Sequence, residues 1–294
     1  MINDTNIYNK GMLISLRMGS YAGRRRMDKE QLKELPTEIV RGVHDLFDLE
    51  YKKLLQEISA FDRHTRHIVW HMCIPFPIDG IYFMPANKIS EAIEMLELRK
   101  TERYELVNQA VENYEAAIEA FAEKYPEYYQ RARNKYLSRD RFHGRFYFNY
   151  QFLNIAAPDE KHAIISPELY KEEVRKFKET IQQMKSDVVS TIYSELLEST
   201  NRLKKQCTEG KPSQRTLNSV NEFLKKIDEV YSDFVDRDDL VKAIKKVKAQ
   251  VLGVTAESLR ASDDTKEKFR KSVSSLVSEI KNLPDIPLKR AIEL

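Results

Sequence analysis

The chain has 294 residues, and its 49 Lys and Arg nearly balance 46 Asp and Glu, which gives a net charge of +3 at pH 7. With 32% charged and 41% hydrophobic residues, the composition excludes collagen-like and low-complexity disordered chains. The length allows one large or two modest domains, and the near-neutral charge argues against bulk capture of nucleic acid while remaining compatible with a local basic patch.

The apolar runs along the chain are only a few residues long, far below the roughly 18 residues of a membrane span. No apolar segment follows a basic start, as it does in a secretory signal. We therefore expect a cytoplasmic protein that does not enter a membrane. The two cysteines, Cys73 and Cys207, lie far apart in the sequence and are expected to be reduced.

A stretch of period two, Met12 to Met18, predicts the first β-strand. A basic cluster follows on a predicted turn and consists of Arg24, Arg25 and Arg26. Three guanidinium groups on a turn are suited to bind phosphate or an acidic surface of a partner protein. The alternative interpretation is a solvated cluster without a ligand.

A helix is expected to open at Pro36, because its apolar stripe runs from Val40 to Phe61. The next segment is rich in histidine and supplies four candidate metal ligands: His64, His67, His71 and Cys73. On a helix the three imidazoles share a face, and nitrogen and sulfur donors suit zinc. The alternative is a solvated or interfacial segment, since no C-x-x-C pair accompanies it.

Arg66 and His71 form an R-x-x-x-x-H pattern in this segment. The pattern resembles the element that HEPN-type ribonucleases place at the mouth of a four-helix bundle. This resemblance implies a ribonuclease effector as an alternative function.

Two further stretches predict strands. Residues 76–84 contain a hairpin turn at Asp79-Gly80, and residues 146–152 alternate aromatic and polar side chains. We expect these stretches to form one small sheet with Met12–Met18. Pro75 and Pro77 lack an N–H donor, so their strand belongs at an edge of that sheet.

A long helix is predicted from Asn87 to Tyr125, followed by a shorter helix that Pro126 begins. Basic and aromatic residues then alternate: Arg131, Arg133, Lys135, Arg139, Arg141 and Arg145 lie among Tyr128, Tyr129, Tyr136, Phe142 and Tyr147. This pattern is typical of surfaces that bind single-stranded nucleic acid, and equally of long side chains that cover an aromatic core.

The C-terminal part is predicted to be entirely helical. Ser166-Pro167 supplies an N-cap and a first-turn proline, and Gly210 and Gly253 mark helix ends. Helices are expected at residues 166–207, 217–234, 240–251 and 262–283. The carboxylates at 236–239 and 263–264 precede helices and are interpreted as N-terminal caps.

These elements predict a mainly α fold with a small β-sheet, in which long antiparallel helical hairpins or a coiled-coil stalk extend from a compact body. We place an α+β body with a long helical excursion at residues 1–160 and an all-helical hairpin or bundle at residues 161–294. The two longest helices would each approach about 55–60 Å. We expect one copy not to cover their heptad seams, and hence a homo-oligomer.

Four segments carry a resemblance to a known family: residues 12–25, Ile81–Pro85, Phe121–Pro126 and Arg145–Phe148. Over residues 10–160 the chain resembles an uncharacterised phage and prokaryotic family, a domain of unknown function. Its members are often encoded near MoxR-type AAA ATPases and von Willebrand factor A proteins. The resemblance implies a non-catalytic subunit or adaptor in a bacterial or phage-infected cell, and it carries no catalytic residues.

The sequence lacks a P-loop, a G-x-G-x-x-G fingerprint, a G-x-S-x-G elbow and an H-E-x-x-H pair. We therefore expect a non-catalytic protein without a cofactor. The heptad seams predict self-association, and the family resemblance implies an adaptor that acts with an AAA ATPase or a von Willebrand factor A partner. Two alternatives remain open, a nucleic-acid-binding effector and a helical pore-forming protein. The candidate anion- or partner-binding residues are Arg24, Arg25, Arg26, Arg131, Arg133, Arg139 and Arg141.

Overall fold

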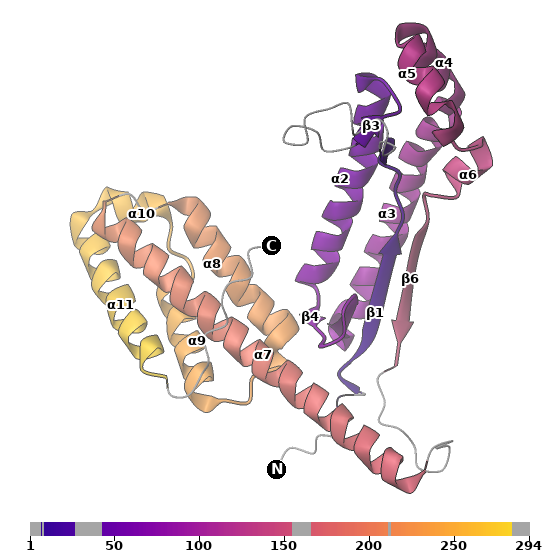
Figure 1. Ribbon diagram of the computed structural model, residues 1–294. Helices are drawn as coiled ribbons and strands as arrows, with labels where there is room; N and C mark the ends of the chain where they lie inside the picture. Colours follow the sequence, from indigo (N-terminus) through magenta and orange to yellow (C-terminus); the bar gives the residue numbers. More distant parts are fainter. Residues whose placement is uncertain (1–6, 8, 27–42, 155–165, 211–212, 284–294) are drawn as a thin grey trace, which may run out of the picture. The chain divides into compact units, whose positions relative to one another are not determined.

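The computed structural model describes the chain except residues 1–6, 8, 27–42, 155–165, 211–212 and 284–294 (Figure 1). The chain forms two compact units, each assembled from separate segments. Unit 1 comprises residues 1–13, 71–89 and 153–294, and unit 2 comprises residues 14–70 and 90–152. Unit 1 thus combines residues from both sides of the boundary predicted near residue 160.

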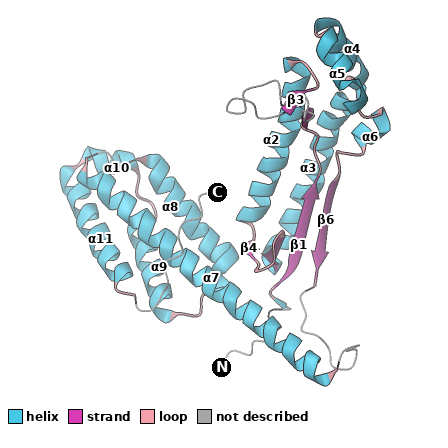
Figure 2. Ribbon diagram, viewed as in Figure 1, coloured by secondary structure: helices cyan, strands magenta, loops and turns pink. Residues whose placement is uncertain are grey.

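The fold is mainly α-helical with a small four-stranded sheet, as predicted (Figure 2). The strands are β1 (Gly11–Met18), β4 (Ile74–Pro75), β5 (Ile81–Pro85) and β6 (Phe148–Leu153), in the order β4-β5-β1-β6. β4 pairs antiparallel with β5, with Ile74 opposite Phe83. The proline-bearing strand is therefore at an edge, as its missing N–H requires, and the turn between β4 and β5 contains Gly80 at φ 76°.

The helix predicted to open at Pro36 begins later. Pro36 lies outside the described residues, and β3 (Val43–Asp45) is a strand that pairs antiparallel with β2 (Arg24–Arg26). α2 spans Leu49–His71. Its start is fixed by the Asp48 carboxylate, which accepts a hydrogen bond from the Tyr51 N–H at 2.9 Å, so a side-chain cap sets the boundary here.

The long helix predicted from Asn87 is divided at Asn113 into two helices, and Pro126 begins a third, as expected. These elements are α3 (Ala86–Glu112), α4 (Tyr114–Lys124), α5 (Pro126–Ala132), the 3₁₀ turn η2 (Arg133–Lys135) and α6 (Arg139–His143). In the pairs of contacting residues, the residue number increases along α2 while it decreases along α3: Asp62 contacts Arg103, and Thr65 contacts Arg99. α2 and α3 therefore form an antiparallel helical hairpin.

Unit 1 is completed by the C-terminal helices. They are α7 (Pro167–Thr208), α8 (Gln214–Lys226), the π-helical turn η4 (Ile227–Tyr231), η5 (Ser232–Phe234), α9 (Asp238–Val251), α10 (Ala256–Ala261) and α11 (Asp263–Lys281). The Ser166 hydroxyl caps α7 by accepting from the Leu169 N–H, as predicted. α10 is a helix that the sequence analysis missed.

The heptad seams of unit 1 are largely buried within the unit. In α7 the seam from Ile181 to Leu196 is buried, as are the seams of α8 to α11, and they share one core with Phe83 of β5. Residues 167–180 of α7 contain no fully buried side chain. Among the described helices, none is long and apolar enough to cross a membrane.

Candidate anion-binding surface

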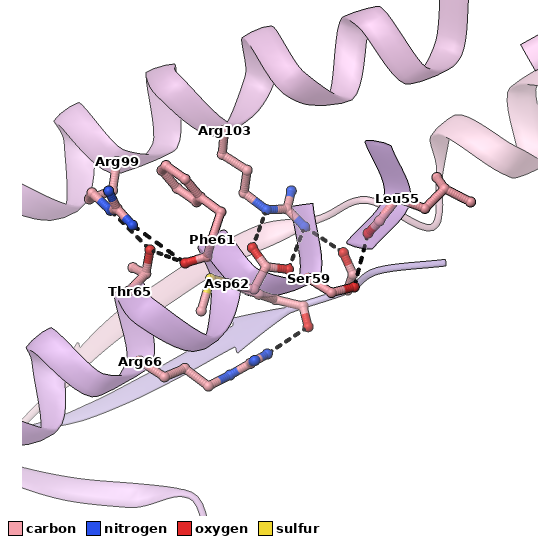
Figure 3. A network of polar contacts seen from close by, with 10 residues as sticks. Leu55, Ser59, Phe61, Asp62, Thr65, Arg66, Arg99 and Arg103 are labelled. Atoms are coloured by element: carbon pink, nitrogen blue, oxygen red, sulfur yellow. Dashed lines mark hydrogen bonds and ion pairs between the residues drawn. The ribbon is translucent and has the colours of Figure 1, made fainter. Parts of the chain in front are cut away.

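A buried ion pair joins the two helices of the unit 2 hairpin (Figure 3). The Arg103 guanidinium donates to both carboxylate oxygens of Asp62, at 2.6 and 3.1 Å, and to the Gly19 carbonyl at 2.5 Å. Their side chains are 1% and 2% exposed. Among the residues that the structure describes, the Nη1 group of Arg103 has no hydrogen-bond partner. A pair this buried requires both members, because either charge alone would be desolvated without compensation.

A second arginine of α3 extends this network toward α2. Arg99 donates to the Thr65 hydroxyl at 3.1 Å, its Nη2 lies 3.2 Å from Nδ1 of His64, and its guanidinium covers the Phe61 ring at 3.6 Å. From α2 itself, Arg66 donates to the Met18 carbonyl at 3.1 Å. Arg99 also pairs with the Glu102 carboxylate at 3.3 Å, so a carboxylate, a hydroxyl and a ring hold Arg99, and a backbone carbonyl holds Arg66.

Gly19 connects this network to the basic segment of the sequence. Its N–H donates to the Tyr147 carbonyl at 2.9 Å while its own carbonyl accepts from Arg103. A Cβ at this position would lie 2.3 Å from the Tyr147 ring and 2.4 Å from the Arg145 carbonyl. Only glycine therefore permits this close approach of β1 to the start of β6.

Five exposed arginines define what we call the α5–α6 arginine surface: Arg131, Arg133, Arg139, Arg141 and Arg145. Within the described residues, none of the five side chains has a hydrogen-bond or ion-pair partner. Residues 124–147 hold seven basic and two acidic residues, so the local charge excess exceeds the +3 of the whole chain. Figure 1 shows α4, α5 and α6 together at one end of unit 2.

The backbone beneath this surface is held by aromatic side chains. The Tyr114 hydroxyl donates to the Leu137 carbonyl and accepts from the Leu137 N–H, at 2.9 and 3.0 Å. The Tyr136 hydroxyl donates to the Leu46 carbonyl at 2.6 Å, and burial raises the pKa of Tyr136 above its usual value. The Phe142 ring stacks on Tyr114 with centroids 4.0 Å apart. The segment is therefore anchored to the core of unit 2.

The aromatic residues of the basic segment have two roles. Tyr136 and Phe142 pack in or against the core, in agreement with the alternative interpretation of the pattern. Tyr128 and Tyr147, in contrast, are 56% and 48% exposed. Among the described aromatic residues of 128–147, these two are the exposed ones, and their rings are accessible to a ligand beside the arginines.

The N-terminal basic cluster differs from the α5–α6 arginine surface because it has an acidic partner. Arg24 Nε lies 3.1 Å from an Asp45 carboxylate oxygen, and Lys52 lies 2.5 Å from the other oxygen of the same carboxylate. This ion pair follows from the pairing of β2 with β3, which sets Arg24 opposite Asp45. The side chains of Arg25 and Arg26 lie outside the described part of the structure.

The four predicted zinc ligands are not brought together. In the described part of the chain, no three His, Cys, Asp or Glu side chains are arranged to hold a metal ion. His64 and His67 are exposed on α2, and His71 is its last residue, whereas Cys73 is 1% exposed. Burial raises the pKa of the Cys73 thiol to about 12, and a metal requires the thiolate.

Both residues of the R-x-x-x-x-H pattern lie on α2. Arg66 and His71 are five positions apart on α2, and at about 100° per residue they project roughly 140° apart around the helix axis. Arg66 is oriented by the Met18 carbonyl. The two side chains therefore do not share a face of this helix.

Comparison with known proteins places the chain in a family. A model described as a protein of unknown function (DUF3150) matches residues 9–258. No curated protein and no solved structure matches the chain. Since the family model covers most of the sequence, the chain belongs to this DUF3150 family of proteins of unknown function.

Proposed function

We propose that the protein is an adaptor that binds single-stranded nucleic acid through the α5–α6 arginine surface. The observation that carries this proposal is the set of five exposed arginines, which have no acidic partner among the described residues. Exposed cations elsewhere on the chain are often paired, as Arg175 is with Glu172 and Glu179. An unpaired cluster is complementary to an anionic ligand.

The chemistry of this surface suits a nucleic-acid backbone. A guanidinium binds phosphate oxygens in a bidentate manner and remains charged at any physiological pH. Tyr128 and Tyr147 supply exposed rings on which unpaired bases stack. The anchored backbone beneath the surface reduces the entropy lost when the arginines bind.

Fluorescence anisotropy with labelled single-stranded DNA and RNA, from about 50 to about 200 mM salt, tests the proposal. We expect affinity to fall steeply with salt, and Arg133→Ala and Arg139→Ala each to reduce the slope of log K against log salt by about 0.7. Tyr128→Ala should weaken binding by about 1–3 kcal/mol without changing the slope.

Arg215→Ala is the matched control, because Arg215 is an exposed arginine of α8 and has no partner in the described part of the chain. The control should bind both strands as the unaltered protein does. If no strand is bound at the lowest salt, or if Arg215→Ala is as harmful as Arg133→Ala, the nucleic-acid proposal is wrong.

A second candidate is an adaptor for an ATPase. The support is family membership together with the resemblance to phage and prokaryotic proteins often encoded beside MoxR-type AAA ATPases and von Willebrand factor A proteins. We propose that this protein comes from a phage or a prokaryote and binds a MoxR-type AAA ATPase or a von Willebrand factor A protein. Co-purification with a MoxR-type AAA ATPase, with and without ATP, is the test, and the absence of a complex in both conditions would exclude this candidate.

A further inference from the structure

Unit 2 contains a second basic site, which we call the α2 hollow. It is an open hollow of about 680 Å³ on one side of α2, next to the end of β1. Its polar lining includes Ser20, Lys53, Gln56, Glu57, Arg63 and Arg66. None of these residues belongs to the α5–α6 arginine surface.

The cations of the α2 hollow all come from one helix. Lys53, Arg63 and Arg66 lie along α2 and line the same hollow. Arg66 is held by the Met18 carbonyl. Lys53 and Arg63 are exposed and, in the described structure, have neither a hydrogen-bond nor an ion-pair partner.

The charge of the lining indicates the charge of its ligand. Three cations and the single carboxylate of Glu57 leave an excess of two positive charges. A phosphate monoester carries about −1.5 to −2 at pH 7 and three acceptor oxygens, which matches this excess. The Ser20 hydroxyl and the Gln56 amide add neutral donors of the kind that bind phosphate oxygens or sugar hydroxyls.

The lining residues also indicate which ligands fit poorly. No aromatic side chain lines the α2 hollow among the residues described, so a nucleobase would find no ring on which to stack. We propose that the α2 hollow binds a phosphate group, either as inorganic phosphate or as the phosphate monoester of a sugar.

Isothermal titration calorimetry on the full chain tests this site with two probes, inorganic phosphate and glucose 6-phosphate. We expect binding of at least one probe, weakened by about tenfold or more in Lys53→Ala/Arg63→Ala, because each substitution removes a charge-assisted hydrogen bond. Arg63→Lys should retain part of the affinity. Tighter binding of glucose 6-phosphate than of phosphate would identify a sugar phosphate, and equal or weaker binding would identify free phosphate.

Lys178→Ala/Arg215→Ala is the control with the same charge change, since both side chains are exposed and unpartnered in the described structure. Its affinity for both probes should be unchanged. The proposal is overturned if neither probe binds beyond the effect of sodium chloride at equal ionic strength, or if the control loses as much affinity.

Strand binding separates this site from the proposed nucleic-acid function. The Lys53→Ala/Arg63→Ala variant should bind single-stranded DNA as the unaltered protein does. If it lost phosphate and strand binding together, the α2 hollow would belong to the path of the strand and would not be a separate site.

Discussion

At the scale of single residues, the buried charges of Asp62 and Arg103 dominate the hairpin of unit 2. Arg103→Met would leave the Asp62 carboxylate desolvated without its cation, so we expect a loss of about 3–5 kcal/mol in the free energy of unfolding. Urea denaturation followed by circular dichroism measures this loss.

The same pair allows a double-variant test. Asp62→Leu/Arg103→Met replaces both charges by apolar groups of comparable volume, and such replacements are often neutral. We expect the double variant to be more stable than Arg103→Met alone, although the Gly19 carbonyl also loses its donor. If the loss in the double variant equalled the sum of the losses in Asp62→Leu and Arg103→Met, the two charges would not be coupled.

The two cysteines should be unreactive in the folded chain. Cys73 and Cys207 are 1% and 3% exposed, and burial raises the pKa of both thiols, to about 12 for Cys73. Iodoacetamide reacts with thiolates, so we expect little labelling near neutral pH and labelling of both residues in urea. Mass spectrometry measures the result, and Ser186→Cys, at an exposed position of α7, is the control that should label rapidly.

The sequence contains a signal for the buried pair. Buried positions of α2 recur at 51, 55, 58, 62, 65 and 69, and Asp62 occupies one of them. On α3, Arg103 is 1% exposed, whereas its apolar neighbour Tyr104 is 38% exposed. Two opposite charges at core positions of neighbouring helices predict a pair, but only once the pairing of the helices is known.

At the scale of elements, local chemistry determined which boundaries could be predicted. Ser166 and Ser262 cap α7 and α11 through the N–H groups of Leu169 and Thr265, and both helix starts were predicted correctly. α10 was missed because its signal is a capping box of Thr255 and Ser258, in which serine replaces the usual glutamate or glutamine. The pairing of β2 with β3 is a non-local event that helical periodicity could not reveal.

One ion pair between two elements makes the stability of unit 1 depend on pH. Lys88 near the start of α3 donates to Glu229 of η4 at 2.7 Å, and this hydrogen bond holds the pKa of Glu229 below its usual value. The ionised carboxylate therefore stabilises the fold above its ordinary pKa of about 4.5, and this contribution is lost as the pH falls through the lower folded value.

We expect Glu229→Gln to lower the free energy of unfolding at pH 7 by at most about 1 kcal/mol, since the Glu229 side chain is 36% exposed and screened by solvent. The difference from the unaltered protein should shrink below about pH 4. Urea midpoints at both pH values measure it. Glu222→Gln should show no such difference, because Glu222 is exposed on α8 and has no partner among the described residues.

At the scale of the whole molecule, the covered seams change the expectation of self-association. The prediction of a homo-oligomer depended on heptad seams that one copy leaves bare. The seam positions from Ile181 to Leu196 and those of α8, α9 and α11 are buried within unit 1, which leaves residues 167–180 as the part of α7 without a buried side chain. Because this remaining part is short, we expect the 34.6 kDa chain to be a monomer at micromolar concentration. Light scattering measures the mass, and a defined oligomer would support the original prediction.

The segments of the two units alternate along the sequence, which has a consequence for synthesis on the ribosome. The Phe83 ring of β5 contacts the Phe234 ring of η5 with centroids 5.4 Å apart, and Lys10 donates to the Asp233 carbonyl at 2.8 Å. At a translation rate of about 5–20 residues per second, Phe83 is made about 8–30 s before Phe234. During that interval the nascent chain holds an unfinished apolar surface, which makes the emerging N-terminal half a natural client for chaperones.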